Sequence, residues 1–214
     1  ESDEWGGAPG CFVLTESLVK HSLATSSENT VKIDLTKEFT VNSEGTTDLV
    51  VDFDLRKAVK YDNSFDAESD YSFVTSAELK TALRPVVESN TGSIKGKLTK
   101  SAATGERLFV YAYKKGEFDA ETETSAQGSG NIQFANAVTS VEVDDSDNYK
   151  LSFLEEGEYE LHVAAYDNDS NGKAVFTGMV EASSVGGVTL LDNVSVESNT
   201  ELSLNINITG LLGI

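Results

Sequence analysis

The stretch Asn148–Asp167, "NYKLSFLEEGEYELHVAAYD", shows most clearly the pattern from which we predict the fold class. Apolar and polar residues alternate on both sides of the turn "EEGE", which contains Gly157. A period of two is typical of β-strands with one buried face, and a glycine between two such runs marks a tight turn. The stretch therefore predicts two antiparallel strands, with Gly157 at a positive φ in the turn between them.

The same alternation extends over most of the chain. In "LVVDFDLRK" the residues Leu49, Val51, Phe53 and Leu55 form the apolar side, and the last run is "ELSLNINIT". Turns rich in Gly, Asp and Asn, such as "ATGE", "GSGN" and "DNDSNG", separate the runs. Many short strands joined by such turns predict an all-β protein built from antiparallel β-sandwiches.

We expect at most one short helix. The candidate is "TSAELKTAL", in which Thr75 or Ser76 is placed to cap the first turn and Pro85 bars continuation. A polar bridge, "ESNTG" (residues 88–92), separates two sets of strands. We therefore predict two tandem sandwich domains, residues 1–91 and 92–214. The first is short of strands, which leaves open whether its sandwich is complete.

The composition excludes several classes of function. Thirty-six acidic residues against sixteen basic ones give a net charge of −20. Such a surface repels nucleic acid and anionic lipid, so neither is an expected partner. The sequence also has no apolar run long enough for a membrane-spanning helix.

Basic and acidic residues are distributed unevenly. Residues 95–115 hold six basic residues and one acid, whereas residues 117–160 hold twelve acids and one lysine. Two readings stay open: the two patches complement each other between neighbouring molecules, or each is a solvated face.

Cys11 is the only cysteine, which excludes a disulfide within the chain and disfavours a zinc site built on cysteines. The preceding "GGAPG" resembles the small residues before a lipoprotein cleavage site, but the apolar run of such a signal is missing. Lipidation, an idle thiol and an intermolecular role all stay open for Cys11. The start at Glu1 is what we expect of a processed or trimmed protein.

Residues from Gly92 to about Thr209 resemble a carboxypeptidase-regulatory-like or transthyretin-like domain, related to the Cna B-type repeats of surface proteins. The resemblance is carried by "GSIKGKL", "FVYAYKKG" and the run from Val138 to Asp167. It implies a prealbumin-like sandwich that acts as a spacer or stalk without catalysis. Tyr149 and Tyr159 are expected at strand starts, with their rings over the edge of the core.

Residues Phe12 to Val87 resemble part of a bacterial secreted-lipoprotein family of unknown function. The residues that carry this resemblance are "VVDFDLRKAV", "LRPVV" and the following "GSIKG". The resemblance implies a location outside the cytoplasm, extracellular or at the cell surface, and no activity.

No arrangement of residues points to catalysis. The chain has two histidines, His21 and His162, and no serine lies in a nucleophile-elbow sequence. Gly-rich phosphate loops and zinc-ligand spacings are also missing. We therefore expect a protein that is not an enzyme and requires no cofactor.

The loop "AYDNDSNGK" is a candidate calcium site. Asp167, Asp169 and Asn171 alternate ahead of a glycine, as at the start of an EF-hand loop, but Gly178 stands where the bidentate glutamate is needed. A looser site would draw carboxylates from a second loop. The alternative is a turn in which Asp and Asn bond their own backbone. The second loop contributes Asp144, Asp145 and Asp147.

The last strand is the more informative feature. In "ELSLNINIT" the apolar residues Leu202, Leu204, Ile206 and Ile208 share one side. The strand either completes its own sandwich or fills a gap in a neighbour's sheet, and the N-terminal segment with Phe12 and Leu14 is a second candidate donor. Repeated head-to-tail joints of this kind yield an open filament.

We accordingly expect an extracellular structural or adhesive protein, with a pilus-like filament subunit as its more specific form. Its partners would be further copies of itself or other cell-surface molecules. The alternative function is a carbohydrate- or ligand-binding module that uses an aromatic face. The aromatic residues available for that face are Tyr111, Tyr113, Tyr159, Tyr166 and Trp5.

Overall fold

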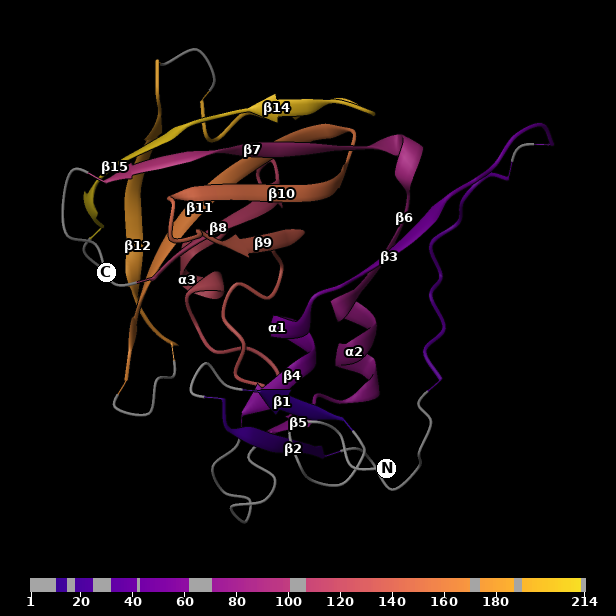
Figure 1. Cartoon of the computed structure of the whole chain (residues 1–214), viewed down its shortest axis with the longest axis horizontal. Helices are drawn as coiled ribbons and strands as arrows, with labels where there is room; N and C mark the ends of the chain where they lie inside the picture. The colour runs from indigo at the N-terminus through magenta and orange to yellow at the C-terminus, as the bar shows by residue number, and fades with distance from the viewer. Residues whose placement is uncertain are drawn as a thin grey trace. The chain divides into compact units, whose positions relative to one another are not determined.

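The structure is a computed structural model in which strands predominate (Figure 1). It describes residues 11–14, 18–24, 32–41, 43–61, 71–100, 107–169, 174–186 and 190–212. Two compact units alternate along the sequence. Unit 1 comprises Glu1–Glu38, Val51–Pro85 and Thr124–Ala135, and unit 2 comprises Phe39–Val50, Val86–Glu123 and Asn136–Ile214. The division of the chain into two tandem domains, residues 1–91 and 92–214, stays a prediction.

The chain passes between the units inside two strands that pair with each other. These strands are β3 (Leu49–Phe53) and β6 (Leu83–Val87), and they form a two-stranded sheet. A short 3₁₀-helix, η1 (Glu88–Asn90), follows β6.

Unit 1 holds a small sheet and two helices. The strand order is β1-β2-β5-β4, in which β2 and β5 run parallel. The helices α1 and α2 contribute Ala58, Leu79 and Ala82 to a small core that also contains Val74. The elements are β1 (Phe12–Leu14), β2 (Lys20–Ala24), α1 (Leu55–Ala58), β4 (Val59–Tyr61), β5 (Tyr71–Phe73) and α2 (Ser76–Ala82).

Helix α2 confirms the helix predicted from "TSAELKTAL". The Thr75 hydroxyl caps it by accepting the Glu78 amide at 3.4 Å, and the Glu78 carboxylate accepts the Thr75 amide at 3.0 Å. The same carboxylate accepts both the amide and the hydroxyl of Ser129, each at 2.6 Å. Glu78 thus ties the start of the helix to the segment Thr124–Ala135 of the same unit.

These hydrogen bonds make the stability of unit 1 depend on pH. The Ser129 hydroxyl, followed by Thr75 and the Ser129 amide, lowers the pKa of Glu78 to about 2. Because the folded pKa lies below the usual value of 4.5, the stabilisation is complete above that pH and is lost as the pH falls toward 2. We expect Glu78→Gln to lower the free energy of unfolding at pH 7 and to flatten its decline between these pH values. Denaturant melts as a function of pH measure both effects. The control is Glu44→Gln, which removes an exposed carboxylate and should leave the decline of the free energy of unfolding unchanged. An equal flattening in the control would contradict the assignment of this decline to Glu78.

Unit 2 is dominated by one large mixed sheet, curled so that one face encloses a core (Figure 1). The strand order is β10-β7-β15-β12-β11-β8-β9, with β13 on β11 and β14 on β7. Its elements are β7 (Thr91–Lys100), β8 (Arg107–Lys114), α3 (Ala120–Glu123), β9 (Thr139–Glu142), β10 (Asn148–Glu155), β11 (Gly157–Asn168), β12 (Ala174–Ser184), β13 (Val194–Val196), β14 (Glu201–Ser203) and β15 (Ile206–Leu211).

The core of unit 2 is set by the predicted alternation. Alternate residues of β8 and β11 face inward, so that Val110, Leu161 and Val163 are at most 3% exposed. Tyr149 and Tyr159 lie in the same core, and the Tyr149 hydroxyl donates to the Leu204 carbonyl at 2.6 Å. The predicted positive φ of Gly157 is confirmed at +147°, but β10 and β11 do not pair with each other: β10 pairs with β7, and β11 pairs with β12 and β8.

Strand β10 lies at one end of the strand path and is interrupted by a β-bulge. Its pairing with β7 shifts between Leu151 and Leu154, and Phe153 has a φ of 56°, in the left-handed region. A phenylalanine there is an outlier that the surrounding structure must enforce. The bulge bends this strand away from regular pairing.

The prediction of a mostly β protein is confirmed, but two details of it were wrong. The described residues contain three α-helices instead of at most one. α1 and α3 are single turns started by Asp54 and Asp119, too short for a periodicity to show. The sheets are also mixed, because β14 and β15 both run parallel to β7. Alternation reports which face is buried and carries no information on strand direction.

Candidate strand-addition site

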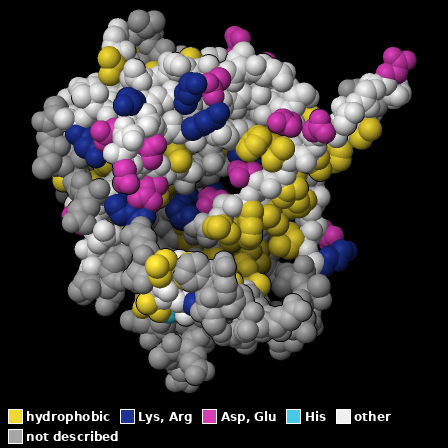
Figure 2. Space-filling model, viewed as in Figure 1, with side chains coloured by type: hydrophobic (Ala, Val, Ile, Leu, Met, Phe, Trp, Pro, Cys, Tyr) yellow, Lys and Arg dark blue, Asp and Glu magenta, His cyan; other side chains and the backbone are white. Residues whose placement is uncertain are grey.

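Strand β3 turns its apolar side chains to solvent. Leu49, Val51 and Phe53 are 43%, 49% and 40% exposed, and Leu55 directly after the strand is 62% exposed. Figure 2 shows hydrophobic side chains gathered along this ribbon. We call Leu49, Val51, Phe53 and Leu55 the β3 stripe. A contiguous run of exposed apolar side chains is typical of an interaction surface.

Charged contacts hold the other side of this segment. The Asp52 carboxylate accepts the Arg84 guanidinium of β6 at 2.7 Å, and Asp54 caps α1 by accepting the Arg56 amide at 3.0 Å. Arg56 in turn donates to the backbone carbonyls of Gln133 and Phe134. Because side chains alternate along a strand, fixing Asp52 on one side turns Val51 and Phe53 to the other.

One edge of β3 pairs with β6, and no described strand pairs with its other edge, which we call the open edge. Among the described residues, β6 is the one strand that pairs with β3. An edge strand with exposed alternate apolar side chains offers a template for another strand, which gains main-chain hydrogen bonds and apolar contacts together. The β3 stripe and the open edge therefore form a candidate strand-addition site.

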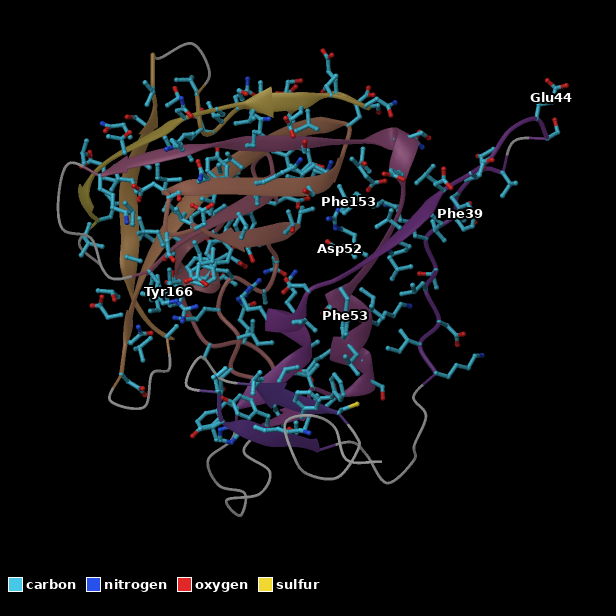
Figure 3. The ribbon with its side chains drawn as sticks, viewed as in Figure 1. Phe39, Glu44, Asp52, Phe53, Phe153 and Tyr166 are labelled. Carbon is cyan, nitrogen blue, oxygen red and sulfur yellow. The ribbon has the colours of Figure 1, made fainter. Side chains whose placement is uncertain are left out.

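The segment before β3 continues the exposed apolar character and adds acids. Phe39 and Val41 are 49% and 69% exposed. Glu44 lies in the turn that follows them (Figure 3), and Asp48 directly precedes β3; both acids are exposed. We call Glu44 and Asp48 the arm acids. Within the described part of the chain, neither carboxylate has a hydrogen-bond or ion-pair partner.

The structure places the predicted C-terminal donor strand inside unit 2. Ile206 and Ile208 of β15 are 0% exposed, and Leu204 is 5% exposed. β15 lies between β7 and β12, and Leu202 of β14 packs against the same core. This strand fills a place in its own sheet, as one of the two predicted alternatives has it. Its exchange between molecules stays a prediction.

The predicted N-terminal donor is an edge strand of unit 1. β1 pairs with β2 alone among the described strands, with Val13 opposite His21. Phe12 and Leu14 are 40% and 37% exposed, and Cys11 before them is also exposed. Their geometry suits an edge contact better than that of β15 does, because less apolar area is buried in place.

The two loops predicted to bind calcium use their carboxylates differently. Asp144 accepts the backbone amides of Ser146 and Asn148, each at 2.8 Å, and these bonds lower the pKa of its carboxyl group, the Asn148 amide most. That geometry is a self-capped turn, with Asp147 at φ 63°. No group of three or more His, Cys, Asp or Glu suited to a metal occurs among the described residues. Asp145, Asp167 and Asp169 belong to the described part, and Asn171 lies outside it. Calcium binding stays a prediction.

The aromatic residues do not form an open platform. Tyr111, Tyr113 and Tyr159 are all 0% exposed, and the Tyr113 hydroxyl donates to the buried Glu123 at 2.7 Å. Tyr166 is half-buried, with its hydroxyl 2.8 Å from that of Tyr111 (Figure 3). Trp5 lies outside the described residues. This arrangement gives little support to the carbohydrate-binding alternative.

Three basic residues of β7 and β8, Lys95, Lys100 and Arg107, form ion pairs with acids of unit 2. Arg107 contacts Glu142 through two nitrogens, at 2.5 and 2.7 Å, and Lys100 lies 3.3 Å from Asp147. Glu201 bonds Lys150 and also Lys95, which together lower its pKa to about 2. Part of the charge asymmetry of the sequence is thus satisfied by ion pairs within unit 2.

Sequence reasoning identified the apolar side of "LVVDFDLRK" but not its exposure. A signal was present in the alternating Asp52, Asp54 and Arg56, since a strand with acids on one side and a basic residue nearby can bury ion pairs and expose its apolar side.

None of the helices in the described residues is long and apolar enough to cross a membrane.

No family model matches the sequence, and no curated protein matches it. Among solved structures, the fold is distantly similar to β-domains of Gram-positive pilins and a pilus adhesin. A variant of BcpA, the major pilin subunit of Bacillus cereus, is 14% identical, with 65% of this chain and 36% of that chain covered and a TM-score of 0.31. GBS52, the minor pilin of Streptococcus agalactiae, is 13% identical, with 70% of this chain and 52% of that chain covered and a TM-score of 0.27. The pilus-presented adhesin Spy0125 (Cpa) is 13% identical, with 59% of this chain and 28% of that chain covered and a TM-score of 0.28. The chain spans between about a quarter and about half the length of these proteins, and similarity at this level carries no argument about function.

Proposed function

We propose that this protein is a non-enzymatic structural protein of the cell surface that joins another polypeptide by β-strand addition at β3. The observation that carries the proposal is the β3 stripe on a strand with an open edge. Fully burying a side chain such as Val, Leu or Phe stabilises by about 1.5–3 kcal/mol, so burial of even half of the stripe supports a stable joint.

The surface location rests on the resemblance of residues 12–87 to a secreted-lipoprotein family and of residues 92–209 to spacer domains. The more specific form, a filament subunit joined head to tail, needs a donor strand. β1 is the better donor within this chain, because withdrawing β15 would expose Ile206 and Ile208. The partner is then either another copy or a different surface protein.

Amide hydrogen exchange with an uncharged peptide tests strand addition directly. We expect a short peptide in which Val alternates with Thr to protect alternate amides of β3, because an added strand bonds the main chain on one edge. Val51→Asp should weaken binding at least tenfold, since it places a charge in the contact. Val185→Asp, a change at a second exposed valine, is the matched control. Binding without protection of β3, or equal binding by Val51→Asp, would refute the proposal.

A further inference from the structure

We infer that the strand added to β3 belongs to a different protein and carries basic side chains beside its alternating apolar residues. This inference rests on the proposed function, and it identifies the chemistry of the partner. Two observations carry it: the uncompensated arm acids and the overall charge of the chain.

The arm acids lack the ion pairs that some other acids of this protein form, and they do so directly beside the β3 stripe. Asp52 is paired with Arg84, Glu142 with Arg107, and Glu201 with two lysines. Glu44 and Asp48 have no Lys or Arg nitrogen within 4.0 Å among the described residues. They flank the exposed apolar residues Phe39, Val41 and Leu49 within the same short segment, Phe39–Val50.

A partner strand with lysine or arginine at its ends would place cations beside these acids. Its alternate apolar residues would meanwhile cover Leu49, Val51 and Phe53. Charge complementarity at the rim of an interface chooses between partners and raises the association rate more than it raises affinity. In this inference the arm acids favour basic partner strands over acidic ones, and the β3 stripe supplies most of the binding free energy.

A second copy of this chain fits the site less well. Each copy carries a net charge of −20, so association brings like charges together. If the same segment of two copies met at this site, Glu44 and Asp48 of one copy would also lie opposite the same two acids of the other copy. Like charges in direct contact are a standard means of rejecting a partner.

Matched peptides test this inference. One peptide alternates Val with Thr and ends in Lys on both sides, and its pair carries Glu in place of Lys. We expect the Lys peptide to bind about tenfold tighter at low ionic strength, and the difference to shrink to about threefold or less in about 0.5 M NaCl, where screening acts within a few ångströms. The double variant Glu44→Gln/Asp48→Asn should remove the difference. Glu117→Gln/Glu158→Gln, which neutralises two other exposed acids of unit 2, should keep it.

The outcomes separate the inference from the proposed function. If the uncharged and Glu peptides bind β3 as tightly as the Lys peptide, strand addition stands and the inference is overturned. If no peptide binds β3, the proposed function itself fails. The last experiment is sedimentation of the chain alone. If the chain self-associates, if this association strengthens with salt, and if Val51→Asp abolishes it, a second copy is the occupant of the site and the inference is overturned.

Discussion

Replacing Gly96 with Ala is expected to destabilise unit 2 severely. Gly96 lies in the middle of β7, and a Cβ built on it would collide with the carbonyl carbon and oxygen of Leu204 and lie 3.0 Å from the Tyr149 ring. The obstructing atoms belong to the backbone and cannot rotate away. Leu204 is held in place by its amide, which donates to the Lys95 carbonyl at 2.8 Å, and by the Tyr149 hydroxyl. The strands must therefore separate.

Overpacking of this kind costs on the order of 3 kcal/mol or more. For a chain of this size, each kcal/mol lowers the melting temperature by about 2–4 °C, so we expect a fall of about 6–12 °C in a thermal melt. Gly210→Ala is the matched control, because a Cβ there meets nothing within 4 Å and its φ is not in the left-handed region. A melt of Gly96→Ala within 2 °C of the control would show that β7 and the Leu204 segment are not in contact.

Ile208→Ala is expected to have the second large effect. Ile208 is 0% exposed in the core of unit 2, on the strand that the sequence offers as a donor to another molecule. Removing its side chain leaves a cavity, which costs about 2–5 kcal/mol in the free energy of unfolding. Equilibrium denaturation of the isolated chain measures it.

Leu211→Ala provides the control on the same strand. Leu211 is 42% exposed, so its truncation should cost less than about 1 kcal/mol. If β15 instead served a neighbouring molecule, Ile208→Ala would leave the isolated chain as stable as Leu211→Ala and would weaken assembly alone. The contrast between the two variants thus identifies the molecule to which the last strand belongs.

The local pattern predicted the parts of the fold in which neighbouring residues decide the outcome. Period-two alternation and Gly157 specify β10, β11 and their turn, because each side chain needs only its own strand to select a face. Thr75 and Pro85 likewise bound α2 within ten residues. These elements follow from sequence because the interactions that set them are short in range.

The remaining features depend on contacts between distant residues. Arg84 and Gln133 are far in sequence from Asp52 and Arg56, yet they determine which side of β3 is exposed. The parallel pairing of β15 with β7 joins residues about a hundred positions apart. Such pairings are chosen by the whole chain, and a single sequence shows the alternation without its partner.

The bulge in β10 has a consequence for how these molecules behave when crowded. The unpaired edge of an end strand is a template on which further strands can add, and such addition can lead to amyloid-like stacking. The left-handed Phe153 interrupts the flat hydrogen-bonding ladder that such growth requires. Straightening this kink should therefore raise the tendency to form fibrils at that edge of the sheet, while leaving the proposed strand addition at β3 intact.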